Sequence, residues 1–461
     1  MATISQSLER ARPITLRWQV FLLALPAVGE QFLNMLVGLA DTYLVGNMSV
    51  AAATSLGYGP AEGLTSVGLG STVVWIVTTL FSACAVGSTA LIARATGAKN
   101  GDEANATLRQ SVFLGVVVGV LGMALMYGFA PLVMRLFSSD PTIIELGVSF
   151  LRIVAFSMPL AGVMFLCNAA LRGSGDTRTP LMIMLFVNGI NILVSWLLIN
   201  GRFGLPALGV DGAAWGTMAS RLLAGVVVLL ILMKGRGLLH LDRVPLPNRA
   251  MLWRILRIGA PTGFELFIFQ AALVLSTKFI AGLGTTAYAA HNVVINAESI
   301  SFLPGFGFGI AATTLVGQNL GAQNPQRARR SGEIAYQQAA MFMSFMGLLF
   351  VLFPQVFLGI LTRDQAVVEA GVTPLRMVGV AQPLLAANFV YAGALRGAGD
   401  TRTPLLIKII SPCFVGLPIT LVLIPLLGLN GAWLALSIDL ALQGLLGWWF
   451  FQKERWERIT V

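Results

Sequence analysis

The sequence predicts an all-α polytopic membrane protein with twelve transmembrane helices in two homologous six-helix halves. Hydrophobic residues make up 56% of the 461 residues, only 11% are charged, and the mean hydropathy is +0.81. Soluble domains carry roughly 25% charged residues, so this chain has too few charges to cover a soluble surface. One motif also occurs twice in the chain, which indicates an internal duplication.

The apolar segments are separated by charged or Gly- and Pro-rich breaks. Each segment is long enough for a membrane-spanning helix, which needs ~20 residues. We expect spans near 18–45, 64–93, 107–130, 146–171, 179–200, 211–233, 254–282, 287–317, 332–353, 369–395, 405–425 and 430–451.

The basic residues lie mostly on one side of these spans. With a cytoplasmic N-terminus, only Arg135, Arg202 and Arg363 of the 30 Lys and Arg fall on the opposite side outside the spans. This bias is the positive-inside pattern. The basic pI of about 10.1 therefore indicates orientation and contact with anionic lipids, not nucleic acid binding. We expect a multi-pass protein with both termini in the cytoplasm.

The duplication is clearest in one motif. The string ALRGSGDTRTPL at 170–181 returns as ALRGAGDTRTPL at 394–405 with a single substitution. Because six spans is an even number, both halves enter the membrane from the same side, which predicts a pseudo-two-fold axis along the membrane normal and a central cleft. The expected organisation is an N-terminal lobe at 1–233, a basic cytoplasmic linker at 234–253 and a C-terminal lobe at 254–461.

A second matching pair shows where the halves differ. Pro26 and Glu30 correspond to Pro261 and Glu265, but at a longer offset than the GDTRTPL strings. The first half therefore carries an insertion, which we place at 47–65.

Ionisable side chains inside the spans are functional candidates, because each costs several kcal/mol unless it is neutralised, hydrated or paired. Glu30 and Asp41 lie some 20° from the same helix face and ~16 Å apart along the axis, and Asn34 shares that face. These three residues predict a polar stripe facing protein or a wet cavity. The full set comprises Glu30, Asp41, Glu265, Glu298 and Asp439, with Arg221 and Lys278 as cations.

The two GDTRTPL strings are expected to be structural. Asp176 and Asp400, or the adjacent threonines, can cap the following helix, with Pro180 and Pro404 in its first turn. The glycines of GVVVG at 115–119 fit close packing between helices.

Other residues have a structural and a functional interpretation. Glu30 and Glu265 could satisfy backbone carbonyls freed near the prolines that precede them. Glu298 could pair with a cation or line a cavity of the second half, where Glu265 is also expected. His291 fits a capping or packing role better than a proton relay. Phe306 and Phe308 of PGFGFG at 304–309 could supply an adaptable apolar wall beside the cleft.

Motifs at matching places in the two halves carry a family resemblance. They are the LRGxGDTRTPL strings after spans four and ten, DTYLVG after the first span and AATTLVGQNLGA after the eighth. With them the chain resembles, over essentially its whole length, the multidrug and toxic compound extrusion (MATE) transporters. It is most similar to their prokaryotic DinF-like branch, and this resemblance implies the bacterial inner membrane as the location.

The resemblance implies a cation-coupling site centred on Asp41, which matches the aspartate of the first helix in that branch. Asn191 and Thr217 match the asparagine of helix five and the threonine of helix six. Ser195 stands where the branch has a second aspartate, and Asn34 of the polar stripe is added to the set. Secondary candidates are Glu30, Glu265 and Glu298.

The same comparison favours the proton as the coupling ion. The cluster lacks one charge because of Ser195, which disfavours a tight sodium site, although Na⁺ at Asp41, Asn191 and Thr217 is an alternative. The other main branch of the family places an acid in helix ten, and 378–395 contains none.

These observations predict a secondary antiporter that exports amphipathic organic compounds, often cationic, in exchange for inward H⁺ or Na⁺ by alternating access. The alternative is a flippase for a lipid-linked precursor, as in a related superfamily, which would need a strongly basic cleft. An enzyme is disfavoured because HExxH, GxSxG and Walker motifs are absent. We expect drugs or metabolites and membrane lipids as partners, no cofactor, no nucleic acid and a monomer.

Overall fold

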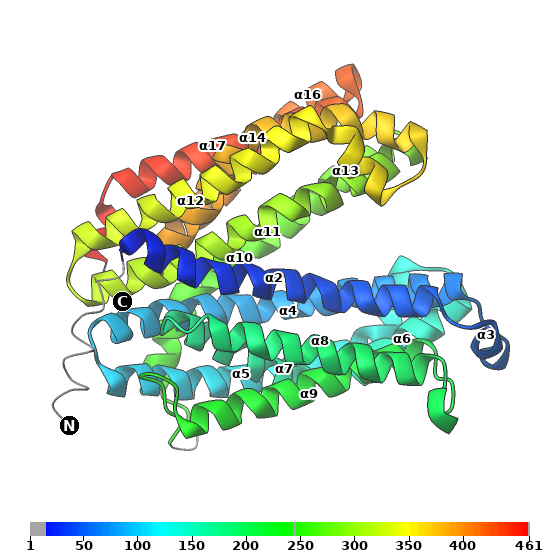
Figure 1. Cartoon of the computed structure of the whole chain (residues 1–461), viewed down its shortest axis with the longest axis horizontal. Coiled ribbons are helices and arrows are strands. Elements are labelled where there is room, and N and C mark those ends of the chain that lie inside the picture. Colours follow the sequence, from blue (N-terminus) through cyan, green and yellow to red (C-terminus); the bar gives the residue numbers. More distant parts are fainter. Residues whose placement is uncertain (1–14, 243–245, 460–461) are drawn as a thin grey trace, which may run out of the picture. The chain divides into compact units, whose positions relative to one another are not determined.

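The computed structural model describes residues 15–242 and 246–459, and regular structure in this part of the chain is helical (Figure 1). The first-half helices are α2 (Leu16–Gly46), α3 (Val50–Leu56), α4 (Pro60–Gly97), α5 (Gly101–Phe137), α6 (Pro141–Ala155), α7 (Met158–Gly173), α8 (Arg178–Ile199), the 3₁₀ helix η1 (Arg202–Gly204) and α9 (Val210–Lys234). The second-half helices are α10 (Arg249–Ala281), α11 (Thr285–Gly321), α12 (Pro325–Leu352), α13 (Pro354–Leu361), α14 (Gln365–Gly397), α15 (Arg402–Ser411), the π-helical turn η2 (Pro412–Gly416), α16 (Leu417–Leu427), α17 (Leu429–Gln452) and η3 (Arg455–Arg458).

Within the described residues, eleven helices are long and apolar enough to cross a membrane, and α6 with α7 makes a twelfth span bent by 58°. The twelve predicted spans are therefore confirmed, but a single helix over 146–171 is wrong. Ser157 donates its hydroxyl to the Val154 carbonyl, and Pro159 lacks the N–H that would continue the helical bonds. These two local features explain the break between α6 and α7.

Contacts group the chain into two packing units. The N-unit comprises Gly29–Ala271 and Gly399–Ile409, and the C-unit comprises Ala272–Ala398, Ile410–Glu457 and α2 up to Val28. The first part of α2 therefore packs with helices of the second half, and most of α10 packs with helices of the first half. The lobes predicted at 1–233 and 254–461, with the linker 234–253, stay a prediction about the sequence duplication.

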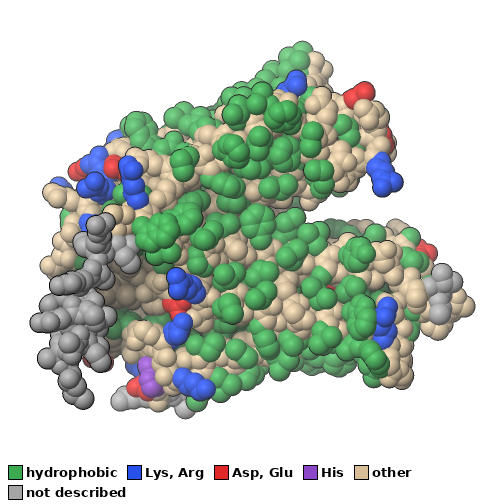
Figure 2. Space-filling model, in the orientation of Figure 1, with side chains coloured by type: hydrophobic (Ala, Val, Ile, Leu, Met, Phe, Trp, Pro, Cys, Tyr) green, Lys and Arg blue, Asp and Glu red, His purple; other side chains and the backbone are tan. Residues whose placement is uncertain are grey.

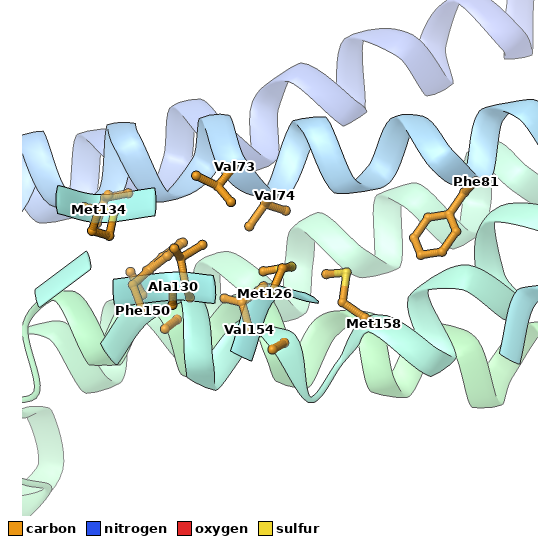
Figure 3. Packing of buried hydrophobic residues seen from close by; sticks show 14 of the residues in the cluster. Val73, Val74, Phe81, Met126, Ala130, Met134, Phe150, Val154 and Met158 are labelled. Carbon is orange, nitrogen blue, oxygen red and sulfur yellow. The ribbon is translucent and has the colours of Figure 1, made fainter. Parts of the chain in front are cut away.

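Apolar side chains from four helices form a core of the N-unit. Figure 3 shows residues of α4, α5, α6 and α7 that point toward one another. In lipid, these interdigitating side chains stabilise the association of the helices through van der Waals packing rather than through removal of apolar surface from water. The labelled members are Val73, Val74, Phe81, Met126, Ala130, Met134, Phe150, Val154 and Met158.

Glycines let α5 and α7 come into backbone contact. A Cβ on Gly115 would lie 2.9 Å from the Gly162 carbonyl, and one on Gly119 would lie 2.5 Å from the Met158 carbonyl oxygen. The packing role predicted for GVVVG is confirmed, because any larger side chain would force these two helices apart.

The surface matches a protein embedded in lipid. Figure 2 shows hydrophobic side chains over the flanks of the helices and charged side chains mostly near the helix ends. Large apolar residues are more than half exposed on several helices, among them Leu121 of α5, Met182 of α8 and Val422 of α16. The hydrocarbon core of a bilayer would cover such side chains.

The short helix α3 lies within the predicted insertion. Only residues 282–284 separate the corresponding helices α10 and α11 in the second half, so α3 has no counterpart there. The Ser49 N–H donates to Asn200 Oδ1 over 2.8 Å, and the Val210 N–H donates to the Tyr58 hydroxyl over 2.9 Å. These bonds tie the insertion to the loop between α8 and α9.

Candidate cation-coupling site

The Asp41 carboxylate of α2 is surrounded by three polar side chains from α8 and α9. Asn191 Nδ2 and Ser195 Oγ each donate to Asp41 Oδ1 over 3.1 Å. Thr217 Oγ1 donates to Asp41 Oδ2 over 2.8 Å and lies 3.2 Å from Asn191 Nδ2. All four residues are buried, with at most 4% of any of them exposed. The structure thus brings together four of the five residues predicted for this site.

Local sequence explains why these side chains meet. Asn191 and Ser195 are four residues apart on α8, so they share one helix face. Gly216 allows α9 to lie directly against that face, because a Cβ there would be 2.1 Å from Ser195 Oγ. Thr217, the next residue, can then reach the carboxylate of Asp41.

Asn34, the fifth predicted residue, does not join the site. Its Nδ2 donates to the Glu30 carbonyl of the preceding turn over 3.0 Å, and the residue is exposed. Asn34 lies about 10 Å from Asp41 along the helix axis. The prediction that it belongs to the coupling cluster is therefore wrong, because a shared face does not bring side chains two turns apart into contact.

Arg221 is a cation that sequence reasoning did not assign to this site. It interacts electrostatically with Asp41, although no hydrogen bond or ion pair joins the two side chains within the described residues. Arg221 lies four residues after Thr217, hence one turn further along the same face of α9. That spacing is the signal by which it could have been found.

The arrangement can hold either protonation state of Asp41. An ionised carboxylate accepts the three bonds described above. A protonated one must donate its proton, and Asn191 Oδ1, which is buried without a partner in the described part of the chain, becomes an acceptor if the amide turns over. The same oxygens suit a hard cation such as Na⁺, but the charge of Arg221 opposes a metal ion at Asp41.

Glu30 lies in a separate ion pair within the N-unit. Arg172 Nη1 at the end of α7 lies 2.6 Å from Glu30 Oε1, and only 13% and 6% of the two side chains are exposed. The paired guanidinium neutralises this carboxylate. Glu30 therefore does not need to satisfy the carbonyls near Pro26, as the structural interpretation supposed.

Glu265 is buried in the part of α10 that belongs to the N-unit. This stretch lies against α4, since a Cβ on Gly259 would be 2.1 Å from the Ala83 carbonyl oxygen. This stretch of α10 is thus grouped with helices of the first half, and the expected position of Glu265 beside a cavity of the second half stays a prediction. Sequence symmetry does not reveal which unit the middle of a long helix packs against.

Two further acids lie in the C-unit. Glu298 is half-buried in α11, and Asp439 is buried in α17. The Asp439 carboxylate accepts hydrogen bonds from Ser411 Oγ and from Gln443 Nε2, the latter over 2.7 Å. His291 packs its buried ring 5.4 Å from that of Trp433, between centroids, in agreement with a packing role.

The aspartates of the two GDTRTPL strings cap α8 and α15. Asp176 Oδ1 accepts from the Thr179 N–H over 3.0 Å, and the Thr179 hydroxyl donates to Asp176 Oδ2 over 2.6 Å. Asp400 and Thr403 repeat both bonds at the same distances. The predicted capping role is confirmed, and it explains why this motif occurs in both halves.

Asp176→Ala is expected to lower the free energy of unfolding by about 1 kcal/mol, the usual value of a helix cap. Burial raises the pKa of Asp176, but the Thr179 bonds and Arg236 outweigh it and hold the pKa below its ordinary value. The cap therefore makes its full contribution to the stability of the folded protein above the unfolded-state pKa of about 3.9. This contribution is lost as the pH falls through the lower pKa that Asp176 has in the folded protein. The thermal unfolding temperatures of wild type and variant, measured from neutral to acidic pH, should become equal only below about pH 4. The control is Asp102→Ala, which removes an exposed aspartate.

Comparisons of the sequence place it in a known group. The MatE family model matches residues 26–197 and 261–422. A probable multidrug resistance protein NorM of Thermotoga maritima is 34% identical over 450 residues, which cover 97% of this chain and 94% of the relative. Multidrug resistance protein PmpM of Pseudomonas aeruginosa is 24% identical over 405 residues, which cover 87% and 82%.

Solved structures share the fold. A MATE crystal structure in the bent conformation aligns with a TM-score of 0.86 at 20% identity, covering 95% of this chain and 96% of that one. An outward-facing multidrug resistance MATE family transporter of the MOP superfamily aligns with a TM-score of 0.85 at the same identity and coverage. The matched family segments fall in both halves of the duplication, and the NorM relative matches nearly the full length. This chain therefore belongs to the MATE family of multi-pass membrane transporters and is not an enzyme.

Proposed function

We propose that this protein is a secondary antiporter that exports amphipathic organic cations in exchange for inward protons by alternating access. The observation that carries the proposal is the Asp41 cluster. Within the described residues, this buried carboxylate of a transmembrane helix accepts hydrogen bonds from hydroxyl and amide donors only. Such a group is a functional candidate because its charge is expensive in the membrane.

Protonation of Asp41 would change the hydrogen bonds that link α2, α8 and α9. The ionised carboxylate accepts from α8 and α9, whereas the neutral acid must donate one bond and loses part of the attraction to Arg221. A proton and an exported cation that favour different states of these helices each promote the release of the other. This linkage is the physical basis of antiport.

The proton is favoured over Na⁺ for two reasons. Ser195 supplies a hydroxyl where a second carboxylate would strengthen a metal site. Arg221 adds positive charge to the surroundings of Asp41. Proton uptake needs only one acceptor, whereas Na⁺ would need several oxygens and would meet like charge.

The names of the relatives support small organic substrates, since both NorM and PmpM are described as multidrug resistance proteins. The lipid-linked precursor flippase has less support, because it needs unpaired cations in a cleft. Arg152 stacks over the Tyr127 ring at 5.1 Å, Arg376 donates to the Val351 carbonyl over 3.1 Å, and the charge of Arg221 is attracted by Asp41.

The protein would work as a monomer in contact with lipid, because one chain supplies every side chain of the Asp41 cluster. The proposed location is the bacterial inner membrane with both termini cytoplasmic; residues 1–14 and 460–461 lie outside the described residues. The positive-inside bias of the loops supports this orientation.

Cysteine labelling tests the orientation. In a Cys413→Ser background, which removes an exposed thiol, a membrane-impermeant maleimide should label Arg363→Cys in intact cells. It should label Arg327→Cys only after permeabilisation. Arg172 is too buried to serve as a probe. The opposite labelling pattern would reverse the topology.

Transport itself is tested in proteoliposomes loaded with ethidium, with a pH gradient or a Na⁺ gradient imposed separately. We expect efflux to follow the pH gradient and to ignore the Na⁺ gradient at matched pH. Efflux driven by Na⁺ alone would refute proton coupling. A complete lack of response to both gradients, at confirmed incorporation, would refute antiport.

A further inference from the structure

α11 carries a carboxylate inside the C-unit that its surroundings do not neutralise. Glu298 is half-buried near the middle of this helix, and it makes no hydrogen bond or ion pair with any residue that the structure describes. An acid in a transmembrane helix needs a partner or water. A bound cation would provide such a partner.

Three phenylalanine rings gather next to this carboxylate. Phe302 lies four residues after Glu298, and side chains at this spacing are neighbours with Cβ atoms roughly 5–6 Å apart. The Phe302 ring centroid is 5.9 Å from that of Phe306 and 6.0 Å from that of Phe389 on α14. Phe306 and Phe389 are 4.6 Å apart. Phe306 is 40% exposed, so part of this cluster is open.

Glycines bring α14 close enough to complete the cluster. A Cβ on Gly305 would lie 2.9 Å from the Phe389 ring, and one on Gly309 would lie 2.9 Å from the Phe389 carbonyl oxygen. Phe308, which we expected to line the wall with Phe306, is instead buried, with 7% exposed. The open aromatic surface therefore consists of Phe302, Phe306 and Phe389.

A buried donor completes the polar part. Ser301, one turn from Glu298, donates its hydroxyl to Gln382 Oε1 on α14 over 2.8 Å. This bond orients the amide, whose Nε2 is buried and has no partner among the described residues. A bound molecule or a water could accept from it.

From this arrangement we infer that Glu298, Gln382 and the three rings form the binding site for the exported organic cation. The carboxylate attracts the charge, and the faces of the rings attract a cation that carries aromatic or alkyl groups. The inference rests on the proposed export of organic cations. It adds that substrate binds within the C-unit, whereas the coupling carboxylate Asp41 lies in the N-unit.

Ethidium binding to the purified full-length protein in lipid nanodiscs tests the inference by fluorescence anisotropy. Glu298→Gln should weaken ethidium binding roughly tenfold, which corresponds to about 1.4 kcal/mol, and should leave the neutral probe N-phenyl-1-naphthylamine unaffected. Phe389→Leu keeps an apolar side chain but removes the ring face, and should weaken ethidium more than the neutral probe. The exposed Glu369→Gln of α14 is the control for loss of a carboxylate.

Equal ethidium affinity of Glu298→Gln, Phe389→Leu and wild type would overturn the inference. So would a loss of ethidium binding in Asp41→Asn with none in Glu298→Gln, which would place substrate at the N-unit and leave the antiport proposal standing. Failure of wild type to bind or export any organic cation would instead refute the proposed function.

Discussion

Asp41→Asn is expected to lower gradient-driven ethidium efflux by roughly tenfold or more, the scale of a coupling free energy of about 1–3 kcal/mol. Asparagine keeps the size of the side chain and can still bond to Asn191, Ser195 and Thr217, so the variant should insert and fold normally. It is permanently neutral, so it cannot alternate between two protonation states. External pH should shift efflux by wild type and leave the variant flat.

The measurement is dye efflux from proteoliposomes at matched protein content over a series of imposed pH gradients. Asp102→Asn makes the same chemical change at an exposed position in the first turn of α5 and should behave as wild type. Efflux by Asp41→Asn at the wild-type rate, with the same pH response, would remove Asp41 as the coupling residue. Glu298 and Glu265 would then be tested in the same way.

Glu30→Ala is expected to lower the free energy of unfolding by about 3–5 kcal/mol, because it leaves the buried Arg172 guanidinium without its carboxylate. Glu103→Ala is the matched control within the N-unit. Its pair with Arg254, at 2.8 Å, is about one-third exposed on both sides, and such pairs contribute about 0–1 kcal/mol. Thermal unfolding in nanodiscs measures both variants.

A double-mutant cycle separates the pair from the individual side chains. If the ion pair stabilises the N-unit, Glu30→Ala and Arg172→Ala together should cost less than the sum of the single changes. If the losses in the free energy of unfolding are additive, the ion pair does not stabilise the N-unit. The same conclusion follows if Glu30→Ala loses no more stability than Glu103→Ala. Glu30 would then return to the candidates for coupling.

Much of the helical framework could be predicted because it depends on local sequence. Apolar length and charged breaks locate all twelve spans, and the aspartates of the GDTRTPL strings cap helices with bonds to residues two and three positions away. The bend between α6 and α7 was missed, although Pro159 was visible. The matching Pro383 lies inside the continuous helix α14, so a proline alone does not decide whether a span breaks.

For the candidate site, motif resemblance located Asp41, Asn191, Ser195 and Thr217, but periodicity wrongly added Asn34. Periodicity describes which face of one helix a residue occupies. It does not say which neighbouring helix covers that face, and only the close contact of α8 and α9 at Gly216 brings Thr217 to Asp41.

The sequence by itself therefore determined the class of protein, the number of spans, the duplication and the family. These properties follow from composition, local bonding and repeated motifs along the chain. Tertiary structure alone decided what surrounds each buried charge. Glu30 pairs with Arg172, Glu265 lies in the N-unit, and Arg221 interacts electrostatically with Asp41. The physical reason is that desolvated charges are governed by contacts across helices, between residues more than a hundred positions apart in several cases.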